Sequence, residues 1–138
     1  MTNVSSTPVT KQPGNYEIYS NFAVMGNEHV LYQCTAEKRF CGSTEIYYTT
    51  LTDARLLVRI ETTDCCNRED YVDNSFFLRD IAVVRQCRES RCCRRTSKLM
   101  EIRGTFGTKR IHMSEKDMAD IMMEMSIRIG DHKLISHH

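Results

Sequence analysis

Apolar and polar residues alternate through much of the chain. Across residues 30–36 every second side chain is apolar, and the intervening ones are mostly polar. The apolar set is Val30, Tyr32, Cys34 and Ala36. Because successive side chains of a β-strand point to opposite faces, this period of two predicts a half-buried strand that ends near Phe40.

Residues 55–61 show the same alternation most clearly. Leu56, Val58 and Ile60 are expected to face inward, and Arg55 is expected to face outward with the other charged residues. Leu57 is the single apolar residue assigned to the outer side. The segment therefore predicts a second half-buried strand.

About seven strands follow from this pattern and from runs of β-branched and aromatic residues. They are expected at residues 28–40, 44–50, 55–61, 75–78, 81–88, 99–103 and 108–113. Residues 62–74 lack alternation and are locally acidic, which predicts a long exposed loop. Gly104 and Gly107 stand where a hairpin between the last two strands needs a positive φ.

The period changes after Ser114. Asp117 follows three residues later in a pattern like a capping box, and apolar residues then recur at helical spacing. These residues are Met118, Ile121, Met122, Met125 and Ile129. Gly130 is the expected C-cap, and the apolar stripe is expected to cover part of a β-sandwich.

The segments outside this pattern are short. A chain of 138 residues is expected to form one core, which we place at residues 28–130. Residues 1–15 are polar and contain two prolines, so a flexible leader is expected there. Residues 16–27 predict an appended element, and residues 131–138 predict a short tail.

The order of elements resembles the pleckstrin-homology-like (PH-like) superfold, especially GRAM domains and bacterial PH-like domains. Residues 47–57, with the sequence YYTTLTDARLL, look like the hairpin in which those domains place a Leu-Thr-Asp turn before an Arg-Leu-Leu strand. Residues 76–84, FFLRDIAVV, are similar to their fourth and fifth strands, which an Asp-Ile corner joins. The resemblance implies a seven-stranded β-sandwich or barrel that a C-terminal amphipathic helix caps.

The same resemblance implies recognition of phosphoinositides, other membrane lipids or a protein segment through loops at one end of the sandwich. Lipid-binding PH domains carry basic residues at the end of the first strand and on the second. Here Lys38 and Arg39 follow the first part of that pattern, whereas residues 44–50 contain no lysine or arginine. This departure argues against a specific phosphoinositide pocket at the usual place.

Charge and hydropathy limit the setting of the protein. No apolar run approaches the roughly 20 residues that cross a bilayer, and the amino terminus lacks the apolar centre of a secretory signal. We therefore expect a cytoplasmic protein, which can also attach peripherally to a membrane. The formal net charge of +1 argues against nucleic acid as a partner of the whole domain.

The strongest local charge lies at residues 85–98, which we expect to form a loop between the fifth and sixth strands. Its basic residues are Arg85, Arg88, Arg91, Arg94, Arg95 and Lys98. Lys38, Arg39, Lys109 and Arg110 are auxiliary candidates for the same surface. The loop is predicted to bind an anionic lipid surface or a protein segment, and the alternative is a solvated loop that pairs with acidic residues 64–73.

Seven cysteines are an odd number, so at least one stays unpaired. Cys92 and Cys93, flanked by arginines, are candidates for S-acylation or redox reactivity, with Cys65 and Cys66 as resolving partners. Adjacent cysteines suit zinc poorly, because zinc ligands are usually two to four residues apart, so we assign no metal site, although a site that also included Cys41 is an alternative. Cys34 and Cys87 are expected to behave as small buried apolar residues.

No catalytic motif is present: the chain has no nucleophile elbow, no His-Glu-x-x-His and no phosphate-binding glycine loop. We expect a non-catalytic PH/GRAM-like adaptor without a cofactor, which docks to an anionic membrane or a partner protein through residues 85–98. The alternatives are a purely protein-binding module, which would use a strand edge or the helix residues Met123 and Ile127, and a cysteine-based metal or redox module.

Overall fold

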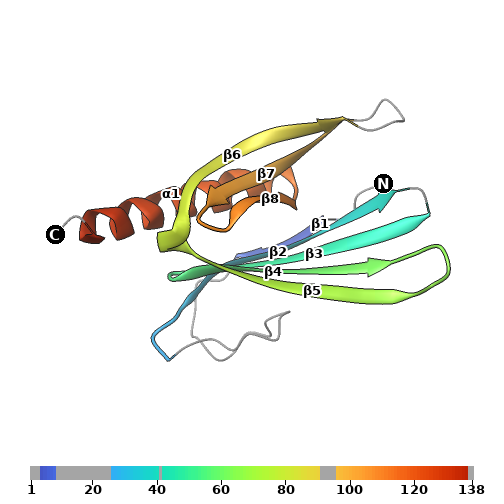
Figure 1. Ribbon diagram of the computed structural model, residues 1–138, viewed down its shortest axis with the longest axis horizontal. Coiled ribbons are helices and arrows are strands. Elements are labelled where there is room, and N and C mark those ends of the chain that lie inside the picture. Colours follow the sequence, from blue (N-terminus) through green and yellow to red (C-terminus); the bar gives the residue numbers. More distant parts are fainter. Residues whose placement is uncertain (1–3, 9–25, 41, 91–95, 137–138) are drawn as a thin grey trace. The chain divides into compact units, whose positions relative to one another are not determined.

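The computed structural model describes residues 4–8, 26–40, 42–90 and 96–136. These residues are mainly β, with two antiparallel sheets and one C-terminal helix, as the alternation predicted (Figure 1). Seven strands lie between residues 30 and 112, in agreement with the expected number. Of the predicted appended element at residues 16–27, residues 16–25 lie outside the described part of the chain.

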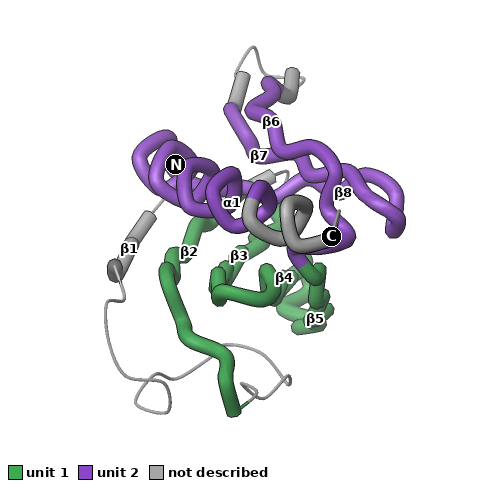
Figure 2. The backbone as a smooth tube through the Cα atoms, turned by 90° about the vertical axis from the view of Figure 1, so that its left-hand side faces the viewer, with its two compact units in different colours: residues 1–77 green, residues 78–138 purple. Residues whose placement is uncertain are grey.

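The chain divides into two compact units, residues 1–77 and residues 78–138 (Figure 2). The first unit is a five-stranded sheet in the order β1-β2-β3-β4-β5. Its strands are β1 (Val4–Pro8), β2 (Val30–Phe40), β3 (Ser43–Thr52), β4 (Arg55–Thr63) and β5 (Glu69–Phe77). Strand β1 belongs to the segment expected to be a leader, and it pairs antiparallel with β2.

The alternation on β2 is confirmed. Val30, Tyr32, Cys34 and Ala36 are all buried, whereas Gln33 and Thr35 between them are half-buried. On β4, Leu56 and Val58 are also buried, as predicted.

The solvent exposure expected for Arg55 and Leu57 on β4 is wrong, because both residues are buried. Arg55 binds the buried Glu28 through two hydrogen bonds, from Nε to Oε2 at 2.9 Å and from Nη2 to Oε1 at 3.0 Å. Thr52 donates to the same carboxylate at 2.5 Å and accepts from the Arg55 amide at 3.0 Å. The alternation of residue types suggested that the side of β4 with charged residues is exposed to solvent. At Arg55 that side is buried, because the buried carboxylate of Glu28 neutralises the arginine.

The exposed loop expected at residues 62–74 is also wrong. Strand β4 continues to Thr63 and β5 begins at Glu69, so the connection is only residues 64–68. Asp64 closes it by accepting hydrogen bonds from the amides of Cys66 and Arg68, both at 2.9 Å. Alternation is absent because the first four residues of β5 are exposed on both faces at the edge of the sheet.

The second unit begins with the 3-10 turn η1 (Leu78–Asp80) and forms a three-stranded sheet in the order β6-β7-β8. Its strands are β6 (Ile81–Ser90), β7 (Thr96–Gly104) and β8 (Gly107–His112). The basic segment at residues 85–98 is therefore not a loop throughout, because residues 85–90 and 96–98 belong to the β6–β7 hairpin. The charged parts of these strands have no alternation of apolar residues, so their sequence is typical of a loop.

A positive φ was expected at both glycines of the β7–β8 hairpin, and this is wrong for Gly104, because only Gly107 of the two has one. Gly107 has φ of +98°, a conformation that side chains rarely adopt. A Cβ at Gly104 would lie 1.9 Å from the backbone oxygen of Asp80, so that glycine permits close approach of η1 to the sheet.

The helix α1 (Glu115–Ser136) packs on β6, β7 and η1 within the second unit. Its predicted start is confirmed, because the Asp117 amide donates to Ser114 Oγ at 3.1 Å and that hydroxyl donates to Asp117 Oδ2 at 2.8 Å. The stripe of Met118, Ile121 and Met125 is buried, as expected. Within the described residues, no helix is both long and apolar enough to span a bilayer.

Gly130 does not end α1, so the expected C-cap is wrong and the helix includes most of the predicted tail. An αL cap needs a positive φ, and Gly130 is not among the glycines that have one. A glycine inside a helix costs only about 1 kcal/mol relative to alanine, which a packed helix tolerates.

Candidate functional site

The predicted basic residues of the second unit lie on both faces of its sheet. Arg88 and Lys98 are directly opposite each other on β6 and β7, and Lys109 and Arg110 are consecutive on β8. Consecutive residues of a strand point to opposite faces, so these side chains do not form one patch. Arg91, Arg94 and Arg95 lie outside the described residues.

Three of the predicted basic residues have acidic partners, one on the helix and two in the first unit. Lys98 Nζ lies 2.8 Å from Glu115 Oε1, and this hydrogen bond is the main cause that holds the pKa of Glu115 below its ordinary value. In the first unit, Arg39 Nε lies 2.7 Å from Glu37 Oε1. Lys38 Nζ there lies 3.9 Å from Glu45 Oε1.

One face of the β6-β7-β8 sheet does gather positive charge, around the buried Glu101 on β7. Arg85 on β6 and Arg110 on β8 are the two cross-strand neighbours of Glu101, and Arg103 follows it by two residues on β7. All four side chains therefore share one face. We call this group the Arg–Glu101 cluster, and the sequence did not single it out because its members come from three strands.

The geometry of the Arg–Glu101 cluster is a convergence of guanidinium groups on one carboxylate. Glu101 Oε1 accepts from Arg85 Nη2 at 2.9 Å and from Arg103 Nε at 3.1 Å. Arg110 Nε lies 3.6 Å from Oε2. The Glu101 side chain is 1% exposed, whereas the three arginine side chains are 50%, 52% and 57% exposed. One buried negative charge thus holds three cations at the surface.

The cluster shifts the pKa of Glu101 and of the neighbouring Cys87. Burial opposes ionisation of Glu101, but hydrogen bonds from Arg85, Arg103 and Cys87 outweigh it and place the pKa of Glu101 below its ordinary value. The pKa of the Cys87 thiol is raised, first by burial and then by its hydrogen bond to Glu101. Cys87 is therefore a protonated thiol near neutral pH, which suits a structural role.

The lowered pKa of Glu101 predicts a specific loss of stability in acid. The contribution of its ionised form is complete above the unfolded-state pKa of about 4.3 and is lost as the pH falls through the lower folded-state pKa. We expect Glu101→Gln to be less stable than wild type at pH 7, with a difference that narrows below about pH 4. Urea unfolding of both proteins at several pH values measures this, and a difference that stays constant with pH would contradict it.

The described cysteines do not form a metal centre. Cys65 and Cys66 are exposed neighbours in the β4–β5 connection, with their sulfur atoms 3.9 Å apart. Cys34 is buried, as predicted, and Cys87 is half-buried. Among the residues that the structure describes, no group of three or more His, Cys, Asp or Glu side chains could hold a metal ion. The predicted reactive residues Cys92 and Cys93, and Cys41, lie outside those residues.

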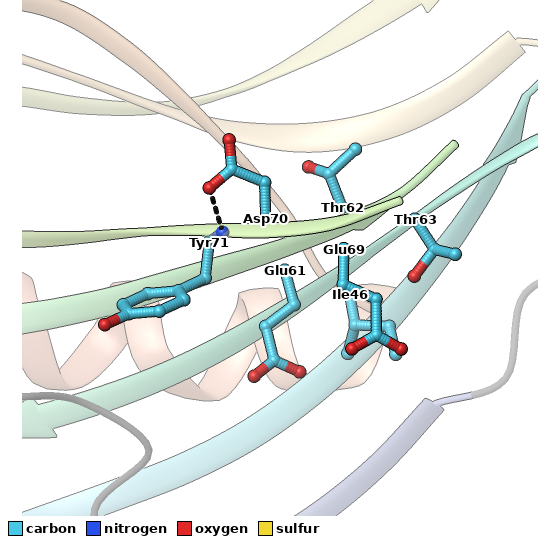
Figure 3. A pocket seen from close by; sticks show the side chains of 7 residues that line it. All are labelled: Ile46, Glu61, Thr62, Thr63, Glu69, Asp70 and Tyr71. Atoms are coloured by element: carbon cyan, nitrogen blue, oxygen red, sulfur yellow. Dashed lines mark hydrogen bonds between the residues drawn. The ribbon is translucent and has the colours of Figure 1, made fainter. Parts of the chain in front are cut away.

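A pocket of about 450 Å³ lies over the end of the β4–β5 hairpin in the first unit (Figure 3). Its lining includes Ile46, Glu61, Thr63, Glu69 and Tyr71, whose side chains share one side of the strands (Figure 3). Carboxylates, an aromatic ring and an aliphatic side chain together suit a positively charged, partly apolar group. The sequence interpretation missed this pocket because it treated the segment as a loop.

No protein-family model, curated protein or solved structure matches the chain.

Proposed function

We propose that this chain is a non-catalytic docking module of the PH/GRAM-like kind, which attaches to an anionic membrane surface at the cytoplasmic side. The observation that carries the proposal is the Arg–Glu101 cluster, in which three half-exposed guanidinium groups surround one buried carboxylate. Guanidinium groups bind phosphate oxygens with paired hydrogen bonds, so lipid phosphates are suitable ligands for this face.

The fold supports the same proposal. Two antiparallel sheets followed by one C-terminal helix are the arrangement that the PH/GRAM resemblance implies. Domains of that kind recognise ligands rather than transform them.

The expected attachment is weak and reversible. A basic residue near an anionic leaflet gains about 1 kcal/mol, and one of the three guanidinium charges is offset by Glu101. The cluster alone then supplies about 2 kcal/mol, far less than stable anchoring requires. We further propose that Arg91, Arg94 and Arg95, which lie outside the described residues, add charge, and that S-acylation of Cys92 or Cys93 adds an apolar anchor.

Co-sedimentation with vesicles tests the proposal. Binding to phosphatidylserine-containing vesicles is expected at low salt, to weaken at higher salt and to be absent with neutral vesicles. Arg103→Gln is expected to lower the partition coefficient about fivefold, which corresponds to about 1 kcal/mol. Arg68→Gln removes the same charge from an exposed residue of the other unit and serves as the control. Equal binding to neutral and anionic vesicles, or no binding to either, would contradict the proposed attachment to an anionic membrane surface.

A further inference from the structure

Strand β5 is an exposed edge with apolar side chains. It is the last strand of the order β1-β2-β3-β4-β5, and Figure 1 shows its outer side along the margin of the first sheet. Tyr71 and Val72 are 51% and 54% exposed. Edge strands present backbone donors and acceptors that can pair with another strand, and proteins usually protect them with charged side chains.

Asp70 provides such protection at one position. Its Oδ1 accepts a hydrogen bond from the Tyr71 amide at 2.8 Å, so a side-chain carboxylate takes the place that the carbonyl of a neighbouring strand would occupy. This contact is local and exposed, because Asp70 and Tyr71 are both exposed residues. An added strand that offers both a backbone carbonyl and a positively charged side chain can replace this hydrogen bond. The Tyr71 amide then donates to the new carbonyl, and the Asp70 carboxylate pairs with the new cation.

Pockets lie on both faces of the β4–β5 hairpin beside this edge. The pocket of about 450 Å³ has Tyr71, Glu61 and Glu69 on one face of the strands, whereas Asp70 points to the other side (Figure 3). A second pocket of about 250 Å³ includes Asp64, Arg68, Asp70 and Val72 in its lining. An added strand would lie about 4.8 Å from β5, and its side chains would alternate between the two faces.

Charge identifies the occupant as basic. Residues 61–73 contain five carboxylates and one arginine. A second copy of β5 in antiparallel pairing would place carboxylates against carboxylates, which is unfavourable. An anionic membrane is repelled for the same reason. A long basic side chain, in contrast, can cross the ring of Tyr71 and reach Glu61 and Glu69.

The ring of Tyr71 already shows this kind of contact. The guanidinium carbon of Arg59 lies 4.5 Å from the ring centroid, and Arg59 is held there by two hydrogen bonds to Asp73 at 2.8 and 3.0 Å. These hydrogen bonds are the main cause that raises the pKa of Arg59. Arg59 Nη1 also lies 3.8 Å from Glu61 Oε2, so this one arginine serves both Asp73 and Glu61. Because the same side of the strands carries three carboxylates, those of Glu61, Glu69 and Asp73, it keeps an excess of negative charge that suits a further cation from a partner.

We propose that β5 binds an extended basic segment of a partner protein as an added strand, with alternate lysine or arginine side chains in the pocket lined by Glu61, Glu69 and Tyr71. This interaction is separate from membrane docking, since it uses the first unit and the opposite sign of charge. The partner class is defined by its chemistry: an extended segment with basic residues at every second position.

The test uses the full chain and a synthetic peptide of the length of β5 that alternates lysine and valine. Amide chemical-shift changes are expected along residues 61–77, and a peptide that alternates glutamate and valine is expected to produce none. Two further peptides carry N-methyl groups on every second amide, one on the odd-numbered and the other on the even-numbered residues, so that each blocks the donors along one edge of the peptide strand. Only the peptide whose N-methyl groups block the donors that face β5 is expected to lose binding, because the amides methylated in the other peptide face solvent.

Variants of the pocket sharpen this test. Glu69→Gln is expected to weaken peptide binding about fivefold, as for loss of one ion pair of about 1 kcal/mol. Glu124→Gln, on the helix of the other unit, removes the same charge and is expected to change the affinity less than about twofold. Shift changes elsewhere in the chain, equal binding of both N-methylated peptides, or equal effects of the two variants would each overturn the proposal. Loss of vesicle binding alone would leave it intact.

Discussion

Replacing Glu28 with Gln is expected to lower the free energy of unfolding by about 3–5 kcal/mol. The reason is the buried ion pair between Arg55, the first residue of β4, and Glu28, which lies two residues before the start of β2. Glu28 and Arg55 side chains are 1% and 7% exposed, and two hydrogen bonds join them. Glu28→Gln removes the negative charge that faces the buried Arg55 guanidinium at these two hydrogen bonds, and breaking a buried pair at one partner costs more than the pair itself contributes.

Urea unfolding followed by circular dichroism measures this change. A double replacement, Glu28→Met with Arg55→Leu, is expected to recover most of the lost stability, because apolar residues of similar volume often substitute well for a buried pair. Glu37→Gln removes the carboxylate from the exposed Arg39 pair and is expected to cost no more than about 1 kcal/mol. Similar losses for Glu28→Gln and Glu37→Gln would show that the buried pair does not have the assigned role.

Replacing Ile121 with Ala is expected to lower the free energy of unfolding by about 2–5 kcal/mol. Ile121 is fully buried on the face of α1 that also buries Met118 and Met125. Truncation removes buried methyl and methylene groups and leaves a cavity that the packed surroundings fill only in part. The slightly better helix propensity of alanine offsets only a few tenths of a kcal/mol.

The same helix offers a matched control. Ile127 is 54% exposed, so Ile127→Ala makes the same chemical change without a buried cavity. We expect its effect to stay within about 0.5 kcal/mol of wild type. Chemical denaturation of the two variants side by side measures the difference, and equal destabilisation would contradict the assignment of the buried face of α1.

Much of the fold was predictable because its signals are local. The alternation at residues 30–36 and 56–58 and the helical spacing from Met118 depend only on neighbours in the chain. The cap formed by Ser114 and Asp117 is likewise complete within four residues. Such features need no knowledge of distant segments, since backbone period and capping chemistry determine them.

The candidate sites were less predictable. The sequence located a basic segment at residues 85–98, but it did not bring Arg85 together with Arg103 and Arg110, which lie on different strands around Glu101. The pocket next to Tyr71 was hidden for a similar reason. An edge strand that is exposed on both faces has no apolar alternation, so its sequence is typical of a loop.

The sequence by itself determined the strands that have one buried face, such as β2 and β4, and the residues that begin the helix, because the period of burial is a local property of the backbone. Only the tertiary structure decided that Arg55 is buried against Glu28, that Glu101 gathers three arginines, and that β5 is an edge. Each of these depends on strand order and register, which bring together residues that are distant in the chain. The environment of a charged group is set by such partners, and no local pattern contains them.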